Sequence, residues 1–236
     1  MKFAAPLIRA TLIKRYKRFL SDHLLADGTE VTAHVANTGA MLGLHEPGME
    51  TWLSPANDPK RKLKFTWELV RAAKGKNGLV GINTQHPNNL AAEAIADGTV
   101  SELAGYPTIR REVRYGSRKS RIDLLLEADD RPPCYVEVKN VHLRRSGPAE
   151  FPDSVTARGA KHLLELKDMV QEGARAVMLY TVQRADCDAF RLADDIDPDY
   201  AAAFADARAG GVEALCYSCK LDETGIWLDR ALPINV

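Results

Sequence analysis

Two apolar stretches of strand length, residues 121–126 and 134–140, flank a segment rich in turn-forming residues. This segment contains Asp129-Asp130-Arg131-Pro132-Pro133, and apolar runs on either side of such a segment are typical of a β-hairpin with a longer loop. A register that places Asp123 opposite Glu137 centres the turn within the same segment. The sequence therefore predicts an antiparallel hairpin, and the apolar character of both strands favours the middle of a sheet.

In this register the hairpin brings two carboxylates together. Directly opposed residues on antiparallel strands have Cβ atoms about 5 Å apart, so the charges of Asp123 and Glu137 would repel each other. A proton, a cationic side chain or a metal ion must neutralise them. Lys139, on the same face of the strand as Glu137, supplies part of that charge, and a divalent cation such as Mg²⁺ or Mn²⁺ could supply the rest. The ordinary alternative is a solvated surface hairpin, because Glu-x-Lys is a common sequence.

The segments around the hairpin indicate a mixed α/β domain. A helix is expected over residues 86–98, a strand over 108–115, a second helix to about residue 172, and an apolar strand over 174–182. Helix, three strands, helix and strand in this order are typical of the α/β class. We place a domain boundary near residue 85, which divides the chain into residues 1–84 and residues 85–236.

Both predicted helices carry charged residues that could face the hairpin. In the first helix Asn88 or Asn89 is the expected cap, and Glu93 falls near the first turn, either favoured there by the positive helix end or pointing at the hairpin as a further acid. The second helix carries a charged stripe beside its apolar one. Such a stripe is usually a solvated face, but three of its four members can be cationic, and Arg158 and Lys161 are candidate phosphate contacts. The stripe consists of Arg158, Lys161, His162 and Glu165.

Residues 1–84 are predicted to form a small β-barrel. Short strands are expected over residues 7–13, 18–25, 30–36, 63–73 and 79–83, with turn signals at Asp27-Gly28 and Asn37-Thr38-Gly39. Up to residue 76 the chain contains 13 Lys and Arg against 7 Asp and Glu, although the whole chain has no net charge. A small, strand-rich and basic module fits the oligonucleotide-binding (OB) fold.

Two basic runs make this module a candidate nucleic-acid-binding surface. Cations interleaved with aromatic rings suit phosphates and stacked bases. Lysines that protect a strand edge are the ordinary alternative. The candidate residues are Lys14, Arg15, Lys17 and Arg18, beside Tyr16 and Phe19, and Lys60, Arg61, Lys62 and Lys64, which precede Phe65 and Trp67.

The composition argues against a secreted or membrane protein. Four cysteines in a chain of this size do not make a disulfide framework, and the lone Cys216-Tyr-Ser-Cys219 lacks the two further ligands of a zinc site. Basic residues from Lys14 onward interrupt the start of the chain, and no apolar stretch has the length of a signal peptide or a membrane span. We expect a cytoplasmic protein with reduced thiols and no membrane partner.

The predicted helix, the Asp on one strand and Glu-x-Lys on the next resemble the core of PD-(D/E)XK nucleases. Glu93, Asp123, Glu137 and Lys139 match its positions in order, although Ile122 stands where the motif has Pro. The resemblance implies metal-dependent hydrolysis of phosphodiesters. Asp123 and Glu137 would hold the metal with the Val138 carbonyl, Lys139 would polarise the attacking water, and Glu93 would bind a second metal or orient solvent.

Several stretches, in order, resemble the sugar fermentation stimulation protein A family along nearly the whole chain. These stretches are residues 12–20, 37–43, 60–69, 81–84, 120–126, 135–140 and 151–159. The resemblance implies an N-terminal OB-like barrel, a C-terminal nuclease-like domain and DNA binding with little sequence preference. It also implies a regulatory role in sugar metabolism, chiefly that of maltose.

Three functions stay open on the sequence. The first is a DNA-binding protein with a Mg²⁺-dependent nuclease site, for which RNA is an alternative substrate and a homodimer an alternative assembly. The second is a non-catalytic DNA-binding regulatory protein that retains the nuclease fold. The third is an enzyme that acts on a small phosphorylated molecule.

Overall fold

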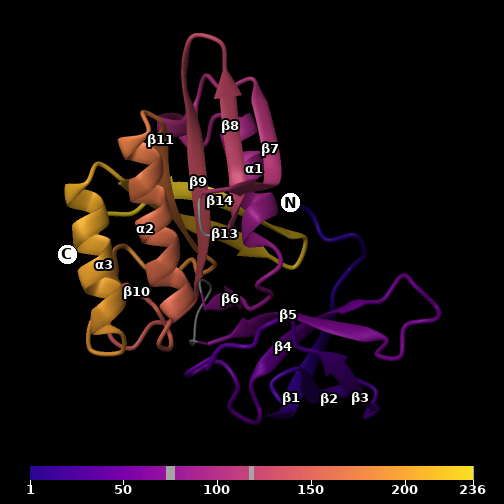
Figure 1. Cartoon of the computed structure of the whole chain (residues 1–236). Coiled ribbons are helices and arrows are strands. Elements are labelled where there is room, and N and C mark those ends of the chain that lie inside the picture. The colour runs from indigo at the N-terminus through magenta and orange to yellow at the C-terminus, as the bar shows by residue number, and fades with distance from the viewer. Residues whose placement is uncertain (73–77, 117–119, 236) are drawn as a thin grey trace.

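The computed structural model describes residues 1–72, 78–116 and 120–235 of the 236-residue chain. Figure 1 shows a β-barrel at the bottom, formed by the first part of the chain, and a mixed sheet with helices above it. This arrangement confirms the predicted fold class, an OB-like barrel followed by a mixed α/β domain. No helix in these three ranges is long and apolar enough to cross a membrane.

Five strands close into the barrel and a sixth extends it. They are β1 (Ile8–Tyr16), β2 (Leu20–Leu25), β3 (Glu30–His34), β4 (Glu50–Pro55), β5 (Phe65–Arg71) and β6 (Leu79–Gly81). Their order is β3-β2-β1-β4-β5-β6, and pairing of β3 with β5 closes the barrel. The sequence predicted each of these strands except β4, and residue 73, the predicted end of the strand that begins at residue 63, lies outside the described residues.

The barrel interior contains one buried histidine beside a buried tryptophan. Trp67 is fully buried, and its ring centroid lies 5.2 Å from that of His23 in an edge-on arrangement. His23 Nδ1 lies 2.9 Å from Thr51 Oγ1 and Nε2 lies 2.7 Å from Ser21 Oγ. Burial lowers the pKa of His23 to about 4.

Acid is expected to destabilise the barrel through His23. The unfolded chain has a histidine pKa of about 6.5, so below that pH the unfolded state binds a proton that the folded state rejects until about pH 4. The free energy of unfolding should therefore fall by up to about 1.4 kcal/mol per pH unit, and by about 3 kcal/mol in total. Urea unfolding between pH 4 and 7 measures this. His23→Gln should flatten the pH dependence and His45→Gln should not; equal slopes in wild type and His23→Gln would contradict the assignment.

The second domain is built on a six-stranded mixed sheet of order β14-β13-β11-β9-β8-β7. Strands β7, β8 and β9 are antiparallel neighbours, β9, β11 and β13 run parallel, and β14 returns antiparallel to β13. The bounds are β7 (Thr108–Tyr115), β8 (Ser120–Ala128), β9 (Arg131–Val141), β11 (Arg175–Val182), β13 (Glu213–Asp222) and β14 (Gly225–Ala231). A separate small sheet contains β10 (Ala149–Phe151), β12 (Phe190–Leu192) and β15 (Ile234–Asn235).

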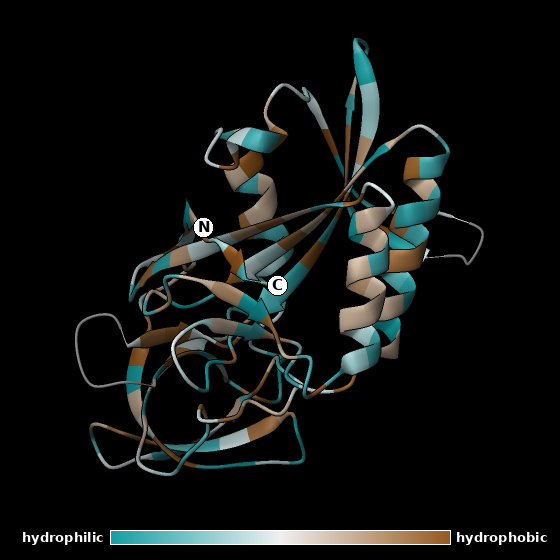
Figure 2. Ribbon diagram, turned by 90° about the vertical axis from the view of Figure 1, so that its left-hand side faces the viewer, coloured by the Kyte–Doolittle hydropathy of each residue, from teal (hydrophilic) through white to brown (hydrophobic). Residues whose placement is uncertain are grey.

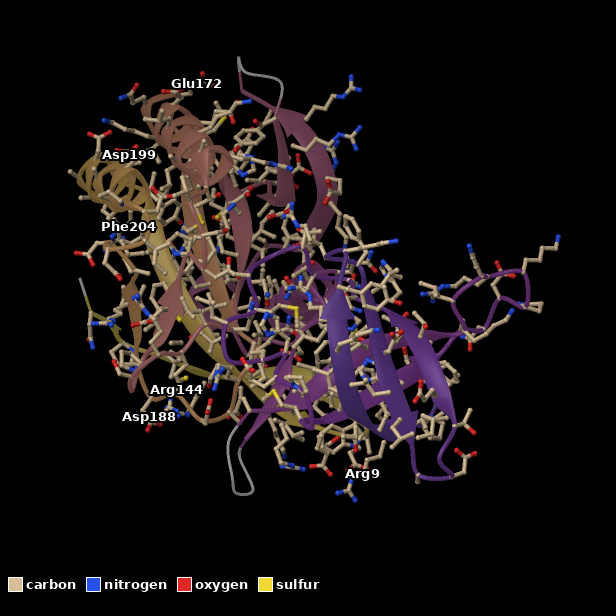
Figure 3. All side chains as sticks on the ribbon, turned by 90° about the horizontal axis from the view of Figure 1, so that it is seen from below. Arg9, Arg144, Glu172, Asp188, Asp199 and Phe204 are labelled. Carbon is tan, nitrogen blue, oxygen red and sulfur yellow. The ribbon has the colours of Figure 1, made fainter. Side chains whose placement is uncertain are left out.

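Helices cover both faces of the large sheet, as Figure 2 shows from the side. Helix α1 (Pro87–Ala96), followed by the 3₁₀ turn η1 (Ser101–Leu103), packs on one face of the sheet, where Leu90 belongs to the same hydrophobic core as Val136 and Val138 of β9. Helices α2 (Ala157–Gln171) and α3 (Pro198–Ala209) pack on the opposite face, where α2 places Leu166 in the core. Side chains alternate along a strand, so β9 separates two cores. Figure 3 shows α2 and α3 side by side, with Glu172 and Asp199 on their outer side.

The predicted hairpin is formed by β8 and β9. Leu124 pairs with Val136 and Leu126 pairs with Cys134, which is the predicted register, and a tight turn at Asp129–Asp130 replaces the predicted longer loop. The paired residues of the two strands end at Leu124 and Val136. Asp123 and Glu137 therefore follow at the point where the strands separate.

The segment that joins the barrel to the sheet is bound on both sides. The Ile82 carbonyl accepts a hydrogen bond from Asn37 Nδ2 (2.9 Å). Asn83 donates from Nδ2 to Glu68 Oε2 (2.9 Å), and its carbonyl accepts from Gln183 Nε2 (3.1 Å). Glu68 belongs to the barrel and Gln183 follows β11, so the two domains are joined through this segment.

Candidate active site

Asp123 lies where β8 separates from β9. Its Oδ2 accepts the backbone N–H of Val138 (2.7 Å), and its Oδ1 accepts a hydrogen bond from Asn88 Nδ2 (2.8 Å) in the first turn of α1. Burial, and then the neighbouring charge of Glu137, raise the pKa of Asp123 to about 6. This carboxylate therefore connects the sheet to α1 and lies beside a second acid, as the hairpin register predicted.

Glu137 is almost completely buried, with 3% of its surface exposed. Its Oε1 accepts hydrogen bonds from Lys139 Nζ (2.8 Å) and from His162 Nδ1. Burial by itself would raise the pKa of Glu137, but the hydrogen bond from His162 and the charge of Lys139 outweigh it, so the pKa lies below its usual value. Its Oε2 is buried and has no hydrogen-bond partner among the described residues.

His162, on α2, holds the Glu137 side chain in place, and the hydrogen-bond partners of its ring indicate which ring nitrogen carries the hydrogen. Arg158 Nε lies 3.3 Å from His162 Nε2, and because arginine only donates hydrogen bonds, Nε2 must accept. The ring hydrogen then sits on Nδ1, which donates to Glu137 Oε1. The sequence placed both residues on one helical stripe, but it predicted a phosphate contact for Arg158 and no role for His162. Lys161, the other phosphate contact predicted on this stripe, is partly exposed.

A third carboxylate, Glu112, lies next to this pair. Its neighbours Arg111 and Val113 on β7 pair with Leu124 and Ile122, which places Glu112 opposite Asp123. Asn88 Nδ2 approaches Glu112 Oε1 at 3.4 Å while it donates to Asp123. Glu112 has a positive φ of 52°, a conformation that non-glycine residues rarely adopt and that is frequent at functional sites. The sequence predicted no site role for Asn88 or Glu112.

Glu93 is not part of this cluster, which corrects the sequence prediction. His86 is the N-cap of α1 and Pro87 its first residue, so Asn88 and Asn89 lie inside the first turn and Glu93 lies in the second. The five residues from Asn88 to Glu93 turn the helix by about 140° beyond a full revolution. Asn88 therefore faces Asp123, while the half-exposed Glu93 carboxylate pairs with the Met1 amino group at 2.7 Å.

The first basic run of the barrel has mostly structural contacts. Arg15 Nη2 donates to the Asn37 and Gly39 carbonyls at 3.0 Å, and Arg18 Nη2 donates to the Thr38 carbonyl at 2.8 Å. These two guanidinium groups support the loop after β3. Lys14, at 3.5 Å from an Asp22 oxygen, and Lys17 are exposed.

The second basic run lies in the loop between β4 and β5. Arg61 donates to Thr66 Oγ1 (2.8 Å) and Lys64 to the Pro59 carbonyl (2.7 Å), while Lys60 and Lys62 are exposed. Arg61 and Lys62 line a surface pocket of about 610 Å³. Its other lining residues include His34, Glu68, Asn83 and His86. His86 Nε2 lies 2.7 Å from Glu68 Oε2, and Asn88 of the carboxylate site follows two residues later.

Comparison with known protein families identifies both domains. Residues 13–82 match a family model described as the SfsA N-terminal OB domain, and residues 85–225 match one described as the sugar fermentation stimulation protein RE domain. The chain belongs to the SfsA family. This confirms the resemblance found in the sequence.

SfsA-family relatives match the chain over its full length. The sugar fermentation stimulation protein homolog of Paramagnetospirillum magneticum is 64% identical and covers 100% of this chain and 98% of its own. The Rhodospirillum centenum homolog is 61% identical over 100% of both chains. The solved structure of Pyrococcus furiosus SfsA in complex with Ca²⁺ has a TM-score of 0.88 at 25% identity and covers 100% of this chain and 98% of that one.

In this SfsA-family chain, the two carboxylates Asp123 and Glu137 suit a cation whose coordination shell is completed by water and substrate. Among the described residues, no group of three or more His, Cys, Asp and Glu side chains is placed to hold a metal ion. Mg²⁺ commonly binds through only one or two carboxylates, with water and substrate phosphate as further ligands. Asp123 and the unpartnered Oε2 of Glu137 match that requirement.

Proposed function

We propose that this protein is a divalent-metal-dependent nuclease that binds DNA with little sequence preference. The observation that carries the proposal is the unpartnered Oε2 of Glu137, buried beside Asp123. The charge of Glu137 raises the pKa of Asp123, and a cation held between the two carboxylates would offset this repulsion. The Ca²⁺ complex of the Pyrococcus furiosus relative supports a divalent cation.

The residues of the chain have distinct expected roles. Bound Mg²⁺ would act as a Lewis acid and lower the pKa of a coordinated water, with Asp123 and Glu137 as its protein ligands. Asn88 and the Val138 N–H hold Asp123 in place, and His162 holds Glu137. Lys139 Nζ is fixed on Glu137 Oε1, and from there it would donate to a phosphate oxygen or to the attacking water.

DNA binding is proposed for the barrel and the neighbouring helix α2. OB-folds bind oligonucleotides with the loops around one face of the barrel. In this protein the loop between β4 and β5 carries the exposed side chains of Lys60 and Lys62. Contacts of this kind to phosphates do not distinguish base sequences. The pocket at this loop lies close to the first turn of α1, so a strand held there would lie near Asp123.

Cleavage assays test the proposal directly. Purified protein is incubated with single- and double-stranded DNA and RNA in Mg²⁺, in Mn²⁺ or in chelator. We expect DNA cleavage that requires a divalent metal, and DNA binding that weakens steeply with salt because bound counterions are released. Absence of cleavage with every metal and substrate would overturn the nuclease assignment.

A second candidate is a non-catalytic DNA-binding protein that regulates sugar, chiefly maltose, metabolism. The names of the curated relatives support the link to sugar fermentation. Glu137 Oε1 already accepts hydrogen bonds from Lys139 and His162, an arrangement that also suits a site that binds no metal through this oxygen and catalyses no cleavage. DNA affinity that persists in chelator, without cleavage in any metal, would favour this function.

A further inference from the structure

The pocket beside the loop between β4 and β5 contains an acidic residue that already has its partners. Among the described lining residues Glu68 is the one acid, and it is 5% exposed. It accepts hydrogen bonds from Ser54 Oγ (2.7 Å) and Asn83 Nδ2 (2.9 Å), and His86 Nε2 lies 2.7 Å from its Oε2. Burial by itself would raise the pKa of Glu68, but these hydrogen bonds outweigh it, so the pKa lies below its usual value. The carboxylate is therefore ionised at neutral pH, and the protein itself stabilises its charge.

Two cationic side chains also line this pocket, and no acid among the described residues pairs with either of them. Lys62 is exposed, and its ammonium group has no hydrogen-bond partner in the described part of the chain. Arg61 donates from Nη2 to Thr66 Oγ1 (2.8 Å), which leaves its other nitrogens free of hydrogen bonds to described residues. Burial, followed by the charge of Arg61, lowers the pKa of His34, so this imidazole lies beside the guanidinium group. The groups that remain open to a ligand are therefore mainly hydrogen-bond donors.

A ligand that matches these groups must accept hydrogen bonds and carry negative charge. Arginine and lysine only donate hydrogen bonds, and phosphate oxygens are strong acceptors that both side chains bind. The volume of about 610 Å³ lies within the range of about 300–1,000 Å³ that is usual for small-molecule sites, so a nucleotide with its phosphate can enter. This chemistry argues against a cation as the occupant and favours a phosphate group.

The inner part of the pocket is closed by the junction between the domains. Asn83 is 3% exposed, and it joins Glu68 of the barrel to Gln183 of the second domain, whose Nε2 donates to the Asn83 carbonyl at 3.1 Å. These bonded side chains leave no passage for a strand between the domains at this point, so a strand that enters the pocket ends there. A terminal phosphate monoester carries a charge of about −1.5 to −2 at neutral pH, against about −1 for an internal phosphate.

We propose that this pocket binds the phosphorylated end of a DNA strand, with Lys62 and Arg61 as the phosphate contacts. The proposal rests on the DNA binding proposed above and names a strand terminus as the group that is recognised. The two cations would hold the additional charge of the terminal phosphate, and the His34 ring would donate to one of its oxygens. A 5′-phosphate and a 3′-phosphate present the same group, so the experiment includes both.

Fluorescence anisotropy in chelator measures the binding of strand ends without cleavage. Single-stranded DNA of about 12 nucleotides, a length within the range that OB-folds bind, carries a 5′-phosphate, a 3′-phosphate or hydroxyl groups at both ends, with the label on an internal base. Wild type should bind one of the phosphorylated strands about tenfold more tightly than the unphosphorylated strand, because charge-assisted hydrogen bonds are the strong ones. Equal affinities for all three strands would overturn the proposal and leave DNA binding intact. Absence of binding to every strand at low salt would overturn both.

Lys62→Gln is the test variant, and Lys60→Gln is its matched control. Both lysines are exposed in the same loop, and of the two it is Lys62 that lines the pocket. Lys62→Gln should reduce the preference for the phosphorylated strand to within about twofold, whereas Lys60→Gln should weaken the binding of all three strands equally and keep the preference. Neither ammonium group has a hydrogen-bond partner among the described residues, so both variants should unfold in urea as wild type does. A preference that both variants keep, or that both lose, would overturn the assignment of the phosphate to this pocket.

Discussion

Asp123→Asn is expected to reduce metal-dependent cleavage of DNA at least about a thousandfold while the protein stays folded. Metal ions contribute several kcal/mol of charge stabilisation in the transition state, and each 1.4 kcal/mol corresponds to about a tenfold change in rate. Asparagine has the size of aspartate but lacks the charge that would hold the cation. The fold should survive, because the substitution also removes repulsion from Glu137, which raises the pKa of Asp123.

The control for this prediction is Asp130→Asn. Asp130 lies in the turn of the same hairpin, is exposed and pairs only with the adjacent Arg131 in the described structure. The chemical change is identical, so cleavage by this variant should remain within about twofold of wild type, since surface pairs contribute little. Initial rates on a labelled DNA substrate at saturating Mg²⁺ compare the three proteins. Comparable rates for Asp123→Asn and wild type would remove Asp123 from the mechanism.

Trp67→Ala is expected to lower the free energy of unfolding by about 3–5 kcal/mol, because it removes the largest kind of side chain from a fully buried position. The indole Nε1 also donates to the Leu69 carbonyl at 2.9 Å, and the ring packs edge-on against His23. Most of the resulting cavity would remain, because the closed barrel restricts how far the strands can move inward.

Urea unfolding at pH 7 measures this loss, with Phe19→Ala as the control. Phe19 lies in the turn between β1 and β2 and is 49% exposed, so its removal should change stability by no more than about 0.5 kcal/mol. Equal midpoints for the two variants would show that Trp67 does not support the barrel core.

The register of the hairpin could be predicted because the information is local. Alternating side chains and a cluster of turn residues within 20 positions place Asp123 beside Glu137, and the pairing of Leu124 with Val136 agrees. Lys139 follows from the same alternation. The barrel strands were predictable for the same reason. The exception is β4, which was not predicted although the turn signal Pro47-Gly48 precedes it and Gly48 has a positive φ of 87°.

The remaining site residues depend on contacts between distant segments. Asn88 reaches Asp123 across 35 residues and His162 reaches Glu137 across 25, and no local pattern states which helix face packs on which strand. Glu93 shows that a small error in the predicted start of a helix is enough to place a side chain on the wrong face. The helix begins at Pro87, ahead of the predicted caps, so Glu93 lies in the second turn and points to the Met1 amino group. The positive φ of Glu112 has no sequence signal, because glutamate is not a residue type associated with that conformation.

The segment that joins the barrel to the sheet would also limit how far a DNA strand bound by the barrel could move. Asn83 is bound to Glu68 on one side and to Gln183 on the other, and His86 is bound to Glu68 as well. A flexible tether would let the barrel deliver DNA over a range of separations. This junction instead keeps the barrel pocket at a constant offset from Asp123, so a DNA end held in the pocket should yield fragments of uniform length. The domain arrangement would then act as a molecular ruler.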